Sequence, residues 1–266
     1  MSRRGIDISR YQSSPDWPLV KADGIEFVII STGDGRGTNP LWVLQAMSAQ
    51  GVGLQVSLYH FLRFGVPPPE QAALMQERWN IAQSSHLNPT RYWLDVEDTE
   101  TKGTLGRVEW LKEVADALPG IPLGVYSGQW YWVPYMANSA AFNYLPLWTA
   151  AYIPNEPQEG QRPALYGGWT KLAIWQWSSS GSVVGISGDV DMNISYEEVE
   201  DDMSQEDKDK IARLERLVAG NGVDNMDGAR VTGEDALSYV DTQGWSLSLG
   251  QQELYQLNLL LKGTLT

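Results

Sequence analysis

The order of strands and helices expected from the sequence constrains the fold of this chain more than any other feature. Apolar, β-branched segments alternate with segments of helical spacing through the first five units, and three further strands follow with loops between them. This pattern predicts an α/β fold, an irregular, TIM-like (βα)5β3 parallel barrel with helices outside. The expected strands span residues 5–9, 26–31, 52–61, 92–98, 121–126, 145–150, 171–177 and 188–194, and the expected helices residues 41–50, 67–83, 105–118 and 130–136.

The fourth expected strand ends in an unusual group of acids. It reads Tyr92-Trp93-Leu94-Asp95-Val96-Glu97-Asp98. Because side chains alternate along a strand, Asp95 and Glu97 point to the same face. One ionised acid then raises the pKa of the other, which is how a protonated general acid is kept available near neutral pH. A solvated turn after a strand is the alternative for this stretch taken alone.

Other polar and aromatic residues fall at the same end of their strands. In a barrel of this kind the chemistry lies at the carboxyl ends of the strands. Four carboxylates from strands one, four and eight would then share one cleft ringed by aromatic side chains, which favours a functional site over a solvated turn. The residues at or near these ends are Asp7, Tyr59, His60, Asp95, Glu97, Tyr126, Trp148, Gln176 and Asp191.

Composition narrows the chemistry further. The formal net charge of −14 argues against nucleic acid as a partner. The absence of Cys excludes disulfide and thiolate chemistry, and with two His a multi-histidine metal site is nearly excluded. The four acids could instead hold Mg²⁺ or Ca²⁺ through oxygen atoms, but that alternative leaves the aromatic side chains unexplained. We therefore expect no metal and no other cofactor.

Several short motifs occur in a fixed order over about residues 4–196. They are Gly5-Ile6-Asp7-Ile8-Ser9 with Tyr11-Gln12, Gly51 through Tyr59-His60-Phe61, Leu94-Asp95-Val96-Glu97, Val125-Tyr126-Ser127, Leu147-Trp148 with Ala151-Tyr152, and Trp175-Gln176-Trp177 with Val190-Asp191-Met192-Asn193. Each motif is weak alone, whereas the ordered set resembles the glycoside hydrolase family 25 lysozymes, the muramidases of bacteriophages, bacteria and some fungi. The resemblance implies an irregular barrel of five βα units and three further strands.

The resemblance also implies an activity, the cleavage of the β-1,4 bond between N-acetylmuramic acid and N-acetylglucosamine in peptidoglycan. By motif, Glu97 is the general acid, Asp95 is its partner, and Asp7 and Asp191 stabilise positive charge in the transition state. Glycoside hydrolysis requires such an acid for the leaving oxygen and carboxylates beside an oxocarbenium-like centre. Whether a carboxylate or the acetamido group of the substrate attacks the sugar stays open.

A second set of residues is expected to contact the sugars by stacking or hydrogen bonding. Family members often carry Glu after the second strand, where this chain has Asp34, so substrate binding on that side departs from the family pattern. The other expected substrate-binding residues are Tyr59, His60, Tyr126, Trp148, Tyr152 and Gln176.

The N-terminal residues and the hydropathy suggest a biological setting. The first residues contain no apolar signal-peptide core, and no run is long enough to span a membrane. We expect a bacteriolytic enzyme of bacteriophage type that is made in the host cytoplasm and acts on the cell wall, released through a holin or carried on the virion. The rival hypothesis is a catalytically silent glycan-binding or structural virion protein with the same barrel.

The C-terminal residues have a different composition. We expect a catalytic barrel over residues 1–198, followed by an acidic linker and a small, mainly helical region over residues 199–266. From residue 197 onward the chain carries 15 of its 33 acidic residues and 6 of its 19 basic residues. Apolar residues at helical spacing within 204–266 favour homo-oligomerisation or docking on a virion over binding to the anionic wall.

Overall fold

The computed structural model describes residues 2–103, 105–196, 223–224 and 230–231. The chain divides into two units, Met1–Glu198 and Val199–Thr266. In the second unit, β9 (Val223–Asp224) pairs antiparallel with β10 (Arg230–Val231). The helices expected in the C-terminal region, and its expected docking role, lie outside the described residues.

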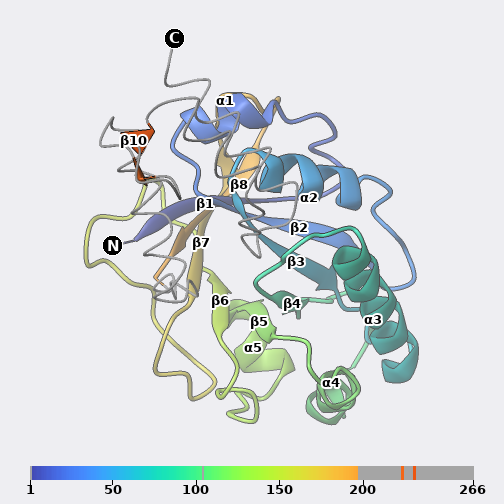
Figure 1. Cartoon of the computed structure of the whole chain (residues 1–266). Coiled ribbons are helices and arrows are strands. Elements are labelled where there is room, and N and C mark those ends of the chain that lie inside the picture. The colour runs from blue at the N-terminus through green and yellow to red at the C-terminus, as the bar shows by residue number, and fades with distance from the viewer. Residues whose placement is uncertain (1, 104, 197–222, 225–229, 232–266) are drawn as a thin grey trace. The chain divides into compact units, whose positions relative to one another are not determined.

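Eight strands of the first unit close into a barrel in sequence order (Figure 1). Neighbouring strands from β1 to β7 run parallel, whereas β8 is antiparallel to both β7 and β1. The strands are β1 (Arg3–Ile8), β2 (Phe27–Asp34), β3 (Gln55–Phe61), β4 (Tyr92–Asp95), β5 (Leu123–Gly128), β6 (Leu147–Ala150), β7 (Ile174–Gly181) and β8 (Val190–Ser195).

The α/β barrel predicted from the alternation is confirmed, but the expectation that every strand is parallel is wrong for β8. A parallel return needs a crossover of about a dozen residues or more, usually a helix. The chain between the end of β7 at Gly181 and the start of β8 at Val190 is shorter than that and contains no helix. The last strand therefore returns as one arm of a hairpin.

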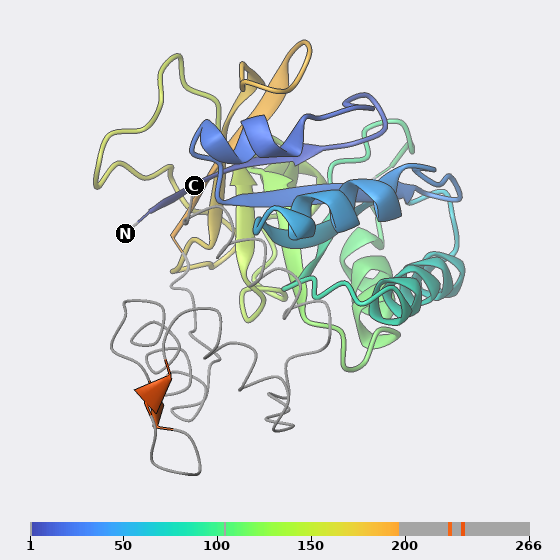
Figure 2. The same cartoon turned by 45° about the horizontal axis from the view of Figure 1, so that its top comes forward.

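The helices of the first unit lie on the outside of the barrel (Figures 1 and 2). The helix α1 is missing from the sequence prediction because its six residues are too few for an apolar period. Its start is nevertheless marked, since the Asp16 carboxylate accepts a hydrogen bond from the backbone N–H of Leu19. The helices are α1 (Trp17–Ala22), α2 (Trp42–Gly51), α3 (Pro68–Ser84), α4 (Arg107–Asp116) and α5 (Gln129–Tyr135).

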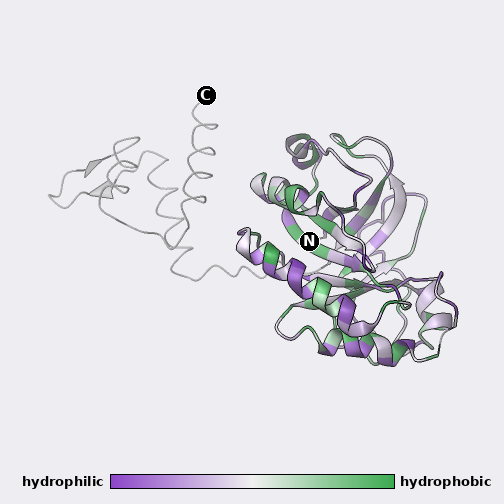
Figure 3. Cartoon of the chain, turned by 90° about the vertical axis from the view of Figure 1, so that its right-hand side faces the viewer, coloured by the Kyte–Doolittle hydropathy of each residue, from purple (hydrophilic) through white to green (hydrophobic). Residues whose placement is uncertain are grey.

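Apolar side chains pack between the strands and these helices. Met75 of α3 and Leu111 and Val114 of α4 are fully buried against the barrel wall. Figure 3 shows hydrophobic residues interspersed with hydrophilic ones along the helices, as expected for helices with one side in water. This layer holds the strands in place without contributing to the rim.

The inside of the barrel is filled by a second cluster of mostly aromatic side chains. The ring of Trp148 lies with its centroid 4.2 Å from that of Tyr126, 5.7 Å from that of Trp93 and 6.0 Å from that of Tyr59. Gly124 provides the space for the Trp93 ring, because a Cβ at this position would lie 2.4 Å from it. The bore is a packed core, so a ligand can reach only the rim.

Candidate active site

Three strands bring four carboxylates to one rim of the barrel. Asp7 lies near the carboxyl end of β1 and is in register with Asp191 of β8. Asp95 is the last residue of β4, and Glu97 follows two residues later. The pKa of each acid is shifted by at least one of the other three, so their charges lie within electrostatic reach. All four acids expected from the sequence therefore meet in one place.

Asp191 reaches this rim by a different route from the one expected. It is the second residue of β8 and thus lies near the amino end of that strand. Because β8 is antiparallel to β1, its amino end lies beside the carboxyl end of β1. A parallel β8 would have placed Asp191 at the opposite rim, away from Glu97.

Glu97 keeps the strand orientation although β4 ends before it. The backbone N–H of Val96 donates to the carbonyl oxygen of Tyr126 at 2.9 Å, and the Ser127 hydroxyl donates to the Val96 carbonyl at 2.7 Å. The chain therefore stays extended beside β5, and Val96 is fully buried in the outer core. Alternation places Glu97 on the same face as Asp95.

Burial is the main cause of the unusual acidity of these carboxyls. It raises the pKa of Glu97 to about 7, with a further contribution from the charge of Asp191. Burial also raises the pKa of Asp191 to about 6, although a hydrogen bond with Asp7 acts in the opposite direction. The pKa values of Asp7 and Asp95 are raised as well, first by burial and then by neighbouring acids. Near neutral pH the site can therefore hold a proton on a carboxyl.

Two buried amides fix the orientation of Asp7. Its Oδ2 accepts hydrogen bonds from Nε2 of Gln176 at 2.8 Å and from Nδ2 of Asn193 at 2.7 Å. The Gln176 oxygen accepts in turn from the hydroxyl of Tyr126 at 2.8 Å. The Asn193 oxygen accepts from the indole N–H of Trp148 at 2.8 Å. Asn193 was not among the expected site residues, and its place two residues after Asp191 on β8 is the signal that could have identified it.

The aromatic residues expected to bind sugars divide into a buried and an exposed group. Trp148 and Tyr126 are only 1% and 5% exposed, so they form the floor beneath the acids and cannot stack on a sugar ring. Tyr59 is half-buried among them. Tyr152 is 57% exposed, and its hydroxyl donates to the oxygen of Gln176 at 3.0 Å. Of the four, Tyr152 is the best placed to contact a ligand.

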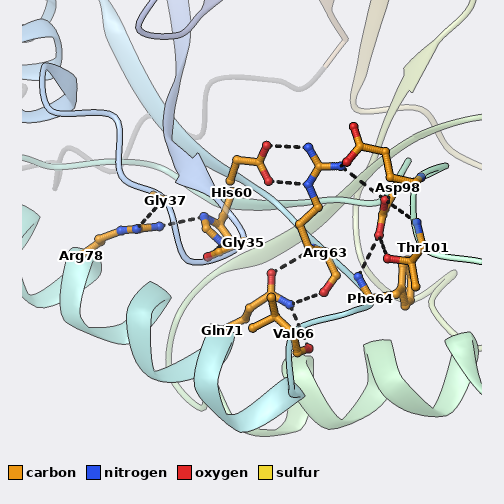
Figure 4. Close-up of polar contacts among 12 residues, drawn as sticks. Gly35, Gly37, His60, Arg63, Phe64, Val66, Gln71, Arg78, Asp98 and Thr101 are labelled. Atoms are coloured by element: carbon orange, nitrogen blue, oxygen red, sulfur yellow. Dashed lines mark hydrogen bonds and ion pairs between the residues drawn. The ribbon is translucent and has the colours of Figure 1, made fainter.

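His60 does not suit the expected contact with substrate, because it is fully buried on the opposite face of β3 from Tyr59. Its Nε2 donates to the carbonyl oxygen of Gly35 at 3.1 Å, and its Nδ1 accepts from the Arg78 guanidinium at 2.8 Å (Figure 4). Burial lowers the pKa of His60 to about 3, so the ring is neutral. It anchors the glycine-rich loop after β2 rather than reaching the cleft.

Asp34 is paired with a residue that the sequence prediction missed. Both of its carboxylate oxygens accept hydrogen bonds from Arg63, at 2.5 and 2.7 Å. Such a two-point pair occupies much of the hydrogen-bonding capacity that a substrate contact would need. Arg63 follows β3 by two residues, the same offset from its strand that Glu97 has from β4.

Comparison with known proteins identifies the family. The model for glycosyl hydrolases family 25 matches residues 6–186. The chain belongs to the family 25 glycosyl hydrolases. An uncharacterised protein, YegX of Escherichia coli O157:H7, is 30% identical over 71% of this chain and 68% of its own length. The autolytic lysozyme of Clostridium acetobutylicum is 31% identical over 71% of this chain and 55% of its own length.

The fold agrees with this assignment. The structure of the bacterial lysozyme from Streptomyces coelicolor superposes with a TM-score of 0.62 at 21% identity, and covers 74% of this chain and 93% of the lysozyme. Membership of family 25 makes the chain a glycoside hydrolase of the lysozyme class. Within the described residues of this family 25 enzyme, we find no group of three or more acidic or histidine side chains that could hold a metal ion.

The rim of this family 25 enzyme has the parts for acid-catalysed glycoside cleavage. One carboxyl can be protonated at neutral pH, and others can remain as anions beside a developing positive charge. The buried Oδ1 of Asp95 has no hydrogen-bond partner among the described residues. A buried acceptor without a partner is costly to keep ionised, which agrees with the raised pKa of Asp95.

Proposed function

We propose that this enzyme hydrolyses the β-1,4 bond between N-acetylmuramic acid and N-acetylglucosamine in peptidoglycan, with Glu97 as the general acid. The observation that carries the proposal is the partly buried Glu97 carboxyl, whose pKa burial and Asp191 raise to about 7. A general acid works best when its pKa lies near the working pH. Family membership supports the substrate class.

The other acids have distinct proposed roles. Asp95 is the partner of Glu97 and tunes its pKa or steadies the acetamido group of the substrate. Asp7 and Asp191 stabilise the oxocarbenium-like centre, with Asp7 held by Gln176 and Asn193. These roles need no cofactor and no metal ion.

The sugar contacts are proposed on the basis of exposure. Tyr152, and to a lesser extent Tyr59, would stack on or hydrogen-bond to the glycan. Tyr126, Trp148 and Gln176 act from below by fixing the acids and amides. The rival function, a silent glycan binder, is disfavoured by the cost of burying several acids that binding alone does not require.

The test is the release of new reducing ends from purified peptidoglycan by wild type and by Glu97→Gln. We expect new muramic-acid ends from wild type and a loss of about 10³-fold or more in the variant. Asp116→Asn, an exposed acid on α4, is the matched control and should keep full activity. New N-acetylglucosamine ends would change the bond assignment, and binding without release by wild type would establish the silent binder.

The biological role is a further part of the proposal. We propose a bacteriolytic enzyme, a phage endolysin or virion-associated lysin, with residues 199–266 joining copies of the chain or docking it on a virion. The structure has no helix, within its described part, that could cross a membrane. Loss of turbidity of intact cells on external addition, compared with lysis after expression inside them, tests the lytic role. Mass measurement of the full chain in solution tests self-association.

A further inference from the structure

Beside the four acids lies a second charged cluster, in which one cation, Arg63, is shared by three acids, Asp34, Asp98 and Glu100. The Arg63 guanidinium forms the two short hydrogen bonds to Asp34 and also lies 3.0 Å from Oε2 of Glu100 and 3.4 Å from Oδ1 of Asp98 (Figure 4). The end of β2 and the loops after β3 and β4 therefore meet at one guanidinium. Arg63 is about one-quarter exposed, so its charge is only partly screened by water.

The position of Arg63 is fixed from several directions. Its backbone N–H donates to Oε1 of Gln71 at 3.0 Å, and its carbonyl oxygen accepts from Nε2 of Gln71 at 2.9 Å. Gln71 is itself fully buried in α3. The guanidinium lies over the ring of Phe61, 4.4 Å from its centroid. A side chain held in this way keeps its charge at one place relative to the neighbouring acids.

The charged and titratable groups around Glu97 come from five elements. Asp95 is the last residue of β4 and Asp191 is on β8. Tyr126 is on β5 and Tyr152 follows β6. All four are acids or phenols. Arg63, after β3, is the cation among the described groups that act on Glu97, and it also acts on Asp95. The backbone places it there, because the N–H of Leu62, the residue before Arg63, donates to the carbonyl oxygen of Asp95 at 2.9 Å, and Phe61 is in register with Asp95. Asp34 acts on Asp95 with the opposite sign.

We propose that Arg63 and Asp34 form a charge-setting pair for the acid pair Asp95 and Glu97. Arg63 is a positioning residue that supplies a fixed positive charge beside the general acid, and Asp34 limits how much of that charge the acids experience. This inference rests on the proposed function, because it assigns a working pH range to Glu97 as general acid.

The two members of the pair make opposite predictions. Activity requires protonated Glu97, so it falls as pH rises through the pKa of that carboxyl, which is about 7. Arg63→Gln removes a positive charge and should move this falling limb to higher pH. Asp34→Asn removes the negative charge that makes two hydrogen bonds to the guanidinium, while Asp98 and Glu100 remain beside it, and should move the limb to lower pH. One unit charge in a partly screened cleft should give a shift of about half a pH unit to one pH unit.

The measurement is the pH dependence of kcat/KM for reducing-end release between pH 4 and 9. Both variants disrupt the same two-point pair between Arg63 and Asp34, so a merely structural role predicts the same direction of change in both. Opposite shifts would support the charge-setting pair. Equal shifts, or unmoved profiles with only a lower rate, would overturn it. The double variant, which removes both charges, should return the limb to within about 0.3 pH unit of wild type.

Matched controls separate folding from charge. Arg63→Lys keeps the charge and loses the two-point geometry, so its limb should stay near that of wild type even if its rate is lower. Glu70→Gln breaks a similar two-point pair with Arg36 on the exposed surface, where the distances are 2.5 and 2.8 Å, and should leave both limb and rate unchanged. A limb in Arg63→Lys displaced as far as in Arg63→Gln would contradict the proposal.

Failure of this inference can be distinguished from failure of the proposed function. If wild type is active, Glu97→Gln is inactive and the Arg63 and Asp34 variants keep the wild-type limb, only the charge-setting pair is wrong. If Glu97→Gln keeps the activity and the limb of wild type, Glu97 is not the general acid and both proposals fail together.

Discussion

Asp95 and Asp98 lie three residues apart on the same rim, and their pKa values are shifted in opposite directions. Both are buried, at 4% and 0% exposure. The pKa of Asp95 is raised, first by burial and then by Glu97, and its Oδ1 has no partner among the described residues. Burial also acts to raise the pKa of Asp98, but hydrogen bonds from Thr101, Phe64 and Glu100 outweigh it, and the pKa is lowered.

The difference lies in the donors that reach each carboxylate. Asp98 accepts from the backbone N–H groups of Phe64 at 3.0 Å, Glu100 at 2.9 Å and Thr101 at 3.2 Å, and from the Thr101 hydroxyl at 2.5 Å. It therefore joins the β3 and β4 loops as a permanent anion. Asp95 faces other acids, and its Oδ1 receives no such donor from the part of the chain that the structure describes. Burial alone thus does not decide the pKa of a carboxyl group, because hydrogen-bond donors lower that of Asp98 whereas neighbouring acids add to the rise caused by burial at Asp95.

The largest effect on stability is expected from Asp98→Asn. The amide would place an N–H group against donors that now meet an oxygen, and the charge-assisted hydrogen bonds would be lost. We expect the free energy of unfolding to fall by about 3 kcal/mol at pH 7. Denaturant unfolding measures this free energy, and the exposed control Asp116→Asn should leave the unfolding midpoint unchanged. A loss below about 1 kcal/mol would remove the contrast between anchor and reactive acid.

Asp95→Asn should lower the activity without lowering the stability. Replacing a buried, unpaired carboxylate with a neutral amide removes an unfavourable burial, so the free energy of unfolding should stay the same or rise by about 1 kcal/mol. Activity should nevertheless fall about 10²-fold, because the partner of Glu97 is lost. Unfolding and reducing-end assays on the same preparation check both parts. A destabilised Asp95→Asn would show that this carboxylate is also a structural anchor.

Glu97 should link stability to pH with a sign opposite to that of Asp98. Its folded pKa of about 7 lies above the ordinary value, so its contribution is full below about pH 4 and is lost as pH rises through 7. Gln does not titrate, so the stability of Glu97→Gln relative to wild type should increase by about 2 kcal/mol from pH 4 to pH 8. Unfolding curves across this range measure the difference, and a constant difference would contradict the raised pKa.

The smallest effect is expected at Tyr152, the exposed residue whose hydroxyl donates to Gln176. Tyr152→Phe removes one of the two hydroxyls that donate to Gln176, while that of Tyr126 remains. We expect a fall in kcat/KM of about 2- to 5-fold and little change in stability. If the larger part of this fall is in KM, Tyr152 contacts the sugar, whereas a fall confined to kcat would place its role in the orientation of Asp7.

The sequence predicted the strand-rich barrel and the meeting of its acids because both follow from periodicity. Apolar segments that alternate with helical ones locate the strands, and a closed barrel brings the strand ends to one rim. Asp7, Asp95 and Glu97 could therefore be placed together from the sequence alone. The boundaries differ most at the end of β2, the start of β3, the end of β4 and both ends of β7. The direction of β8 depends on how a short connection folds back, and periodicity carries no information about that.

What the sequence by itself determined is which residue types lie at the rim, since the period of two decides which side chain faces the bore. Only the tertiary structure decided their roles. It turned His60 toward Arg78, buried Trp148 as floor, paired Asp34 with Arg63, and gave Asp98 donors that Oδ1 of Asp95 lacks among the described residues. The physical reason is that burial and hydrogen-bond partners come from residues distant in the chain, and these two quantities set whether a carboxylate is an anchor or an acid.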